Sequence, residues 1–88
     1  HLLMEGTPAH IERDDVRAAM TAQEGVIDVH HVHIWQLDEQ RTALEAHVVI
    51  PEPKDMDRIK KALKDRLAAE FGIHHSTLEI ETGNCADH

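Results

Sequence analysis

The sequence of 88 residues has one cysteine, one tryptophan, one phenylalanine and no tyrosine. A single cysteine excludes an internal disulfide, which is typical of a protein from a reducing compartment. No apolar run approaches the ~18 residues that a membrane-spanning helix needs. The length allows one domain. Its small core gives limited stability, so a second copy or a bound metal would stabilise it further.

Basic residues are also scarce. Nine Lys and Arg stand against 17 Asp and Glu, and the net charge is -8 with His counted as neutral. Because phosphate binding needs a basic surface, this balance argues against a nucleic-acid partner. An acidic surface attracts divalent cations.

Histidine is abundant, with nine residues in 88. Seven of the nine lie at position 10 or between positions 30 and 75, inside patterned sequence, and no run of His resembles a purification tag. Histidine is the commonest metal ligand in proteins. The composition therefore favours a metal-binding domain.

Hydrophobic periodicity predicts two helices and three strands. Apolar residues recur at helical spacing in the two helices, and Gly25 and Gly72 follow them as stop signals. Asp55 is the expected N-cap of the second helix. The strands are rich in β-branched residues or alternate between apolar and polar ones. The predicted elements are a helix at 12–23, strands at 26–37 and 42–50, a helix at 55–71 and a strand at 75–81.

The order α-β-β-α-β predicts an α+β fold, a ferredoxin-like two-layer sandwich with both helices on one face of the sheet. The second helix then crosses over between two strands of the same sheet. The other face of the sheet carries His, Glu and Trp35. Because a fully solvated face rarely presents a tryptophan, we expect this face to pack against a second copy in a homodimer.

The densest candidate ligands lie in the first strand, where three His occur within four residues. Simple pairing of Gln36 with Thr42 across the turn places His31 opposite His47, close enough to share an ion. A one-residue bulge would place His30 there instead. Spacing alone leaves both alternatives open.

A second group lies around the last strand, with His74 at its start and Glu81 near its end. Three His and one Glu from different strands satisfy the four-coordinate preference of Zn²⁺, and they also suit Co²⁺, Ni²⁺ and Cd²⁺. Cys85 follows Glu81 closely enough to be a further candidate ligand. It could equally be an unattached thiol.

No motif points to catalysis. The sequence has no CxxC, no HExxH and no phosphate-binding glycine loop, and its Ser and Cys residues show no arrangement for a nucleophile. We expect a protein that is not an enzyme. The alternatives to compare are a free-standing metallochaperone or sensor, a module that binds a small organic effector, and, with least support, a zinc hydrolase.

Several segments resemble the C-terminal domain of the cation diffusion facilitator family, and specifically the bacterial cobalt-zinc-cadmium resistance exporters. These segments are LLMEGTP at 2–8, the run from 24 to 35 that ends in VHHVHIW, AHV at 46–48 and HHSTLEIE at 74–81. They cover nearly the whole chain in the family's order and spacing.

The resemblance implies a metallochaperone-like αββαβ domain of a homodimeric exporter that exchanges protons for Zn²⁺, Co²⁺ or Cd²⁺. It implies a regulatory domain at the cytoplasmic face of the inner membrane, with residues 1–10 as the connection from the last membrane helix. Residues 11–82 would then be the metal-binding domain and 83–88 a polar tail. The transmembrane domain of the same protein would be its partner. By motif, the implied metal ligands are His30, His47, His74 and Glu81, with His31 as an alternate ligand and Cys85 at a position where some members keep tail cysteines.

Overall fold

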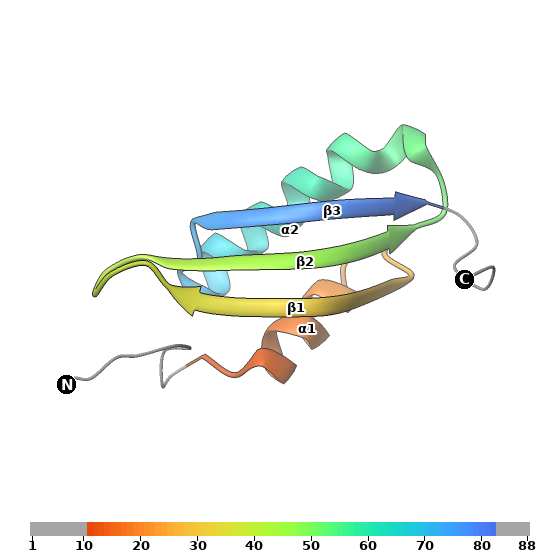
Figure 1. Ribbon diagram of the computed structural model, residues 1–88. Helices are drawn as coiled ribbons and strands as arrows, with labels where there is room; N and C mark the ends of the chain where they lie inside the picture. Colours follow the sequence, from red (N-terminus) through yellow and green to blue (C-terminus); the bar gives the residue numbers. More distant parts are fainter. Residues whose placement is uncertain (1–10, 83–88) are drawn as a thin grey trace.

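The computed structural model describes residues 11–82, which form two helices and three strands (Figure 1). The elements follow the predicted order α-β-β-α-β, with one turn of 3-10 helix, η1, added before the second helix. The predicted α+β class is confirmed, and every element ends within two residues of its predicted limits. The observed bounds are α1 Arg13–Thr21, β1 Asp28–Gln36, β2 Thr42–Ile50, η1 Pro53–Asp55, α2 Met56–Phe71 and β3 His75–Thr82.

The three strands form one sheet in the order β1-β2-β3 (Figure 1). β1 and β2 pair antiparallel across a tight turn, whereas β2 and β3 pair parallel. Parallel neighbours need a crossover connection, which α2 supplies as predicted. The parallel pairing brings the C-terminal ends of β2 and β3 together at one end of the sheet.

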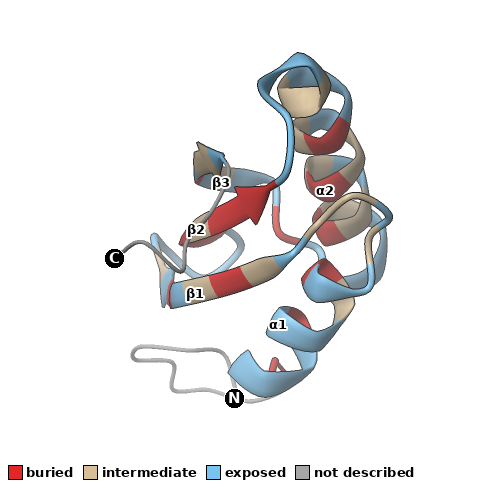
Figure 2. Cartoon of the chain, turned by 90° about the vertical axis from the view of Figure 1, so that its right-hand side faces the viewer, coloured by how far each residue is buried: buried red, intermediate tan, exposed pale blue. Residues whose placement is uncertain are grey.

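Both helices cover the same face of the sheet, and the opposite face has no helix among the described residues (Figure 2). The buried core lies between these layers because the alternating apolar residues of the strands meet the apolar stripes of the helices. Its members are Ile11, Val16, Met20, Val29, Val32, Ile34, Leu44, Ala46, Val48, Ile50, Ile59, Leu63, Leu67, Ile73 and Leu78. Within residues 11–82, no helix is long and apolar enough to cross a membrane.

The start of α2 differs from the prediction in one respect. Asp55 occupies the N-cap position, but its carboxylate makes no capping hydrogen bond. It lies instead 3.4 Å from a guanidinium nitrogen of Arg58. η1, with Pro53 in its first turn, leads the chain into the helix. The end of α2 is as predicted, since Gly72 adopts the left-handed conformation that caps a helix C-terminus.

The two glycines that follow the helices provide a matched pair for a stability test. Both have positive φ, +94° at Gly25 and +70° at Gly72, so alanine is strained at either position. A Cβ at Gly25 would also lie 2.7 Å from Cδ1 of the buried Ile59, whereas a Cβ at Gly72 would meet nothing within 4 Å.

We therefore expect Gly25→Ala to lower the free energy of unfolding by about 1–3 kcal/mol more than Gly72→Ala, since overpacking is added to the backbone strain. Urea unfolding of the two variants measures this difference directly. Equal losses would show that Ile59 moves aside without cost.

Candidate metal centre

A β-bulge in β1 sets the geometry of the candidate site. Gln36 pairs with Thr42 as predicted, but the register shifts between His30 and His33, and His30 therefore lies opposite His47. The alternative with a one-residue bulge is confirmed, and direct pairing of His31 with His47 is wrong. The physical reason is the core, because Val29 and Val32 are both buried although they are three residues apart. In a regular strand only residues two apart share a face.

The open face carries a carboxylate that joins two imidazoles from different strands. The Nε2 atom of His30 lies 3.2 Å from Glu81 Oε1, and the Nδ1 atom of His47 lies 2.7 Å from Glu81 Oε2. Because an ionised carboxylate can only accept hydrogen bonds, each of these two ring nitrogens is the donor. The side chains are 30–36% exposed, so an ion can reach them from solvent.

Hydrogen bonding favours the charged form of this carboxylate. The hydrogen bond from His47 is the largest cause that lowers the pKa of Glu81 below its ordinary value of 4.5, and the hydrogen bond from His30 acts in the same direction. Partial burial opposes them but does not cancel them. Glu81 is therefore an anion at neutral pH, as a metal ligand must be.

The donor set suits a borderline divalent ion. One nitrogen of His30, one nitrogen of His47 and one oxygen of Glu81 all lie within 4.8 Å of one another. In a tetrahedral zinc site the ligand atoms lie about 3.3 Å apart, so small side-chain rotations suffice to bring the three onto one ion. These ligands leave at least one coordination position to be filled.

The structure brings three of the predicted ligands together but does not bring His74 to them. His74 precedes β3 at the end where His75 pairs with Ala43, whereas Glu81 pairs with Val49 at the other end. Seven residues of strand separate His74 from Glu81, about 23 Å. Cys85 lies outside the described residues.

Sequence reasoning missed one side chain at the site. The Oε1 atom of Glu79 lies 3.4 Å from Nε2 of His47, so both ring nitrogens of this histidine face a carboxylate. Glu79 shares its strand face with Glu81, two residues on. Side chains alternate between the two faces along the third predicted strand, and this alternation could have identified Glu79 as a neighbour of Glu81.

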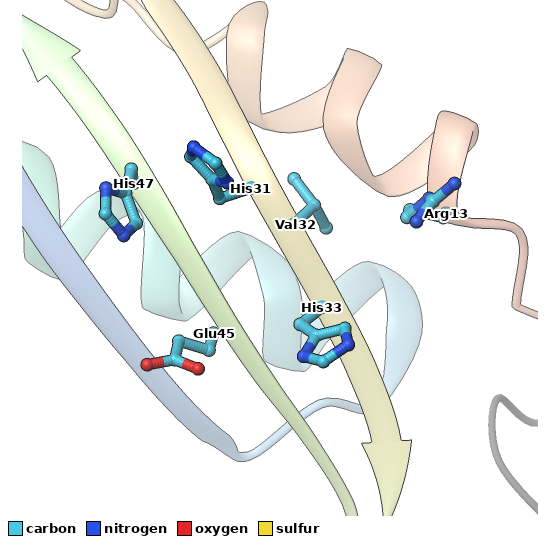
Figure 3. A pocket seen from close by; sticks show the side chains of 6 residues that line it. All are labelled: Arg13, His31, Val32, His33, Glu45 and His47. Carbon is cyan, nitrogen blue, oxygen red and sulfur yellow. The ribbon is translucent and has the colours of Figure 1, made fainter.

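An open hollow of about 530 Å³ adjoins the imidazoles of His31 and His47 (Figure 3). It gives solvent and ions access to His31 and His47. Its lining residues are Arg13, His31, Val32, His33, Glu45 and His47.

The lowered pKa of Glu81 predicts how the stability of the metal-free domain changes with pH. Because the folded pKa lies below the ordinary value, the contribution of ionised Glu81 is complete above about pH 4.5 and is lost as the pH falls through the folded pKa. We expect Glu81→Gln to lower the melting temperature at pH 7 in the presence of a chelator, and to have little effect near pH 3.

Glu45→Gln, on the same face but outside the three-residue group, is the matched control and should change the melting temperature less at pH 7. A deficit of Glu81→Gln that persisted unchanged at pH 3 would contradict the assignment of this stabilisation to the charged carboxylate.

Comparisons with known proteins agree with the fold. Residues 8–83 match the family described as "Cation efflux protein, cytoplasmic domain". The chain is 33% identical over 81 residues to the proton-coupled zinc antiporter SLC30A2 of Rattus norvegicus, and 32% identical over 81 residues to SLC30A8 of Homo sapiens. Each match covers 92% of this chain but only 23% and 22% of the relative. The chain thus spans about a quarter of the length of these relatives.

Two solved structures have a similar fold. The metal-bound C-terminal domain of the CzcD transporter from Cuprividus metallidurans aligns with a TM-score of 0.72 and 30% identity, covering 81% of this chain and 99% of that one. The zinc form of the zinc transporter CzrB aligns with a TM-score of 0.71 at 23% identity, covering 91% of this chain and 93% of that one, which supports the fold alone. The chain belongs to the family of cytoplasmic domains of cation efflux proteins.

Proposed function

We propose that this chain is the metal-sensing and dimerisation domain of a proton-coupled exporter of Zn²⁺ and related divalent cations. The observation that carries the proposal is the convergence of His30, His47 and Glu81 from three strands onto one point of the open face. The relatives named as zinc antiporters support zinc as the ion. The same ligands also accept Co²⁺, Cd²⁺ and Ni²⁺.

In this proposal the domain senses metal at the cytoplasmic face of the inner membrane and catalyses no reaction. Residues 1–10 connect it to the last membrane helix, and residues 83–88, with Cys85, form a polar tail. Because His74 lies far from Glu81 in the same chain, it could only bind the ion held by a second copy, or a separate ion. Family membership favours a transporter domain over a free-standing metallochaperone or an effector-binding module.

The open face of the sheet also suggests how metal controls the dimer. Glu79 and Glu81 lie on it, so the faces of two copies repel each other when no cation is bound. A bound divalent cation offsets this repulsion. The apolar side chains of Ile27, Trp35 and Leu37 are 38–50% exposed and offer surface that a second copy would bury.

We call the form in which the open faces of two copies lie close together the closed dimer. It is then stabilised only because it binds metal more tightly than the separated form does, and a sensor requires this difference in affinity. Titrating the chain with Zn²⁺, while following sedimentation velocity and small-angle scattering, tests this mechanism. We expect a higher dimer fraction or a more compact dimer, and a higher melting temperature, as zinc saturates. Saturation without a change in mass, dimensions or melting temperature would refute regulation by closure.

A further inference from the structure

His31 differs from its neighbours in its backbone. Two residues, His31 and Val32, face Ala46 in the bulge of β1, and His31 has φ of +55°. It is the only non-glycine residue with positive φ among residues 11–82. Backbone strain of this kind persists only where the surrounding structure imposes it, and it concentrates at functional sites.

The bulge changes which side chains share the open face. Val29 and Val32 both point into the core, so His30 and His31 both lie on the opposite side. In Figure 3 the rings of His31 and His47 lie on the same side of the sheet. The extra residue therefore adds a third imidazole beside the two that already contact Glu81.

The spacing of these three rings matches that of imidazoles around one ion. The ring centroids lie 4.8 Å apart for His30 and His31, 5.2 Å for His30 and His47, and 5.0 Å for His31 and His47. With zinc–nitrogen bonds of about 2.05 Å and tetrahedral angles, the centroids of two imidazoles on one zinc ion lie about 5 Å apart. Only rotation of each ring is needed to aim its nitrogen at the ion.

The His31 side chain is free to make that rotation. It is exposed, and it forms no hydrogen bond or ion pair with any other residue in the range 11–82. Its nitrogens lie outside the group formed by His30, His47 and Glu81.

We propose that His31 is the fourth ligand of this site, so that one chain closes a tetrahedral His₃Glu centre without a ligand from water or from a second copy. This inference rests on the proposed zinc binding and adds to it a coordination number and a reason for the strained bulge. A site closed by four protein ligands suits a sensing role, because catalytic zinc sites keep a position open.

Three substitutions test the proposal on the intact chain. His31→Asn removes the imidazole but keeps a residue that tolerates the left-handed conformation. His31→Gly removes the imidazole and also relieves the strain. His33→Asn is the matched control, since His33 lies on the same face of the same strand but outside the three-ring group.

Zinc affinity is measured by competition with a chromophoric chelator, and coordination number by the visible spectrum of the Co²⁺-loaded protein. We expect His31→Asn to lower the zinc affinity by at least about 10- to 100-fold, the effect of losing residues that merely orient metal ligands. The visible bands of Co²⁺ should also change in this variant, whereas His33→Asn should match the wild type in both measurements.

His31→Gly should separate the two roles of the residue. We expect a higher melting temperature than the wild type without metal, and a smaller increase when zinc is added. A His31→Asn protein with wild-type affinity and an unchanged Co²⁺ spectrum would overturn the proposal while leaving zinc binding intact. If the wild-type chain itself bound no zinc, the proposed function would fail as well.

Discussion

Replacing His47 with alanine is expected to lower the zinc affinity of the domain by more than about 100-fold, because even residues that only orient metal ligands contribute 10- to 100-fold. His47 is the central side chain of the site: it lies on the middle strand, 2.7 Å from Glu81 and opposite His30. Its loss removes a ligand and leaves the Glu81 carboxylate without its shorter hydrogen bond. Calorimetric titration with Zn²⁺ at pH 7.5 measures the effect.

His74→Ala is the control for this experiment. It also tests whether His74 is a ligand, as the sequence predicts, or lies away from the ion, as in the structure. Both substitutions remove one imidazole, but residue 74 lies at the opposite end of β3 from Glu81. We expect His74→Ala to bind the first zinc ion with wild-type affinity. If His74→Ala lost as much affinity as His47→Ala, a ligand from a second copy would complete the site, and a centre closed within one chain would be wrong.

Replacing Leu63 with alanine should have the largest effect on stability. This side chain is fully buried in the middle of α2 and belongs to the core cluster. Truncation of a buried leucine costs about 2–5 kcal/mol, through lost burial and the cavity left behind. A domain of this size has about 4–13 kcal/mol of stability in total, so the variant loses a large fraction of it. Urea unfolding monitored by circular dichroism gives the difference.

Lys61→Ala, on the exposed side of the same helix, is the comparison. It removes only an exposed ion pair with Asp65, so we expect a change within about 0.5 kcal/mol. Zinc at 100 times its dissociation constant should restore about 2.7 kcal/mol to Leu63→Ala, because the ion binds only the folded chain. The absence of any zinc stabilisation would show that the ligands do not converge on one ion.

The fold could be predicted closely because each element carries a local signal. β2 matched its prediction at both ends, as Leu44, Ala46, Val48 and Ile50 alternate cleanly between turn residues and Pro51. The helix ends were less certain. Asp55 is a residue type that commonly caps helices, but it does not cap α2. The helical turn already begins in η1, and the carboxylate lies near Arg58.

The site was harder to predict because it depends on tertiary register. The bulge at His31 follows from the burial of both Val29 and Val32, which periodicity alone does not reveal. The position of His74 could, however, have been predicted from the sequence. A third strand parallel to the second places its C-terminal half, with Glu79 and Glu81, beside His47, and its start far from it. The predicted crossover through α2 already implied that the second and third strands are parallel.

The single tryptophan has a further consequence. Trp35 is 38% exposed on the open face, four residues beyond the bulge and towards the hairpin end, and the chain contains no tyrosine. Its ultraviolet emission therefore comes from one indole that lies on the surface proposed to meet a second copy. A blue shift on adding zinc would report the exclusion of water from that surface, so the protein carries an intrinsic optical probe of its own assembly.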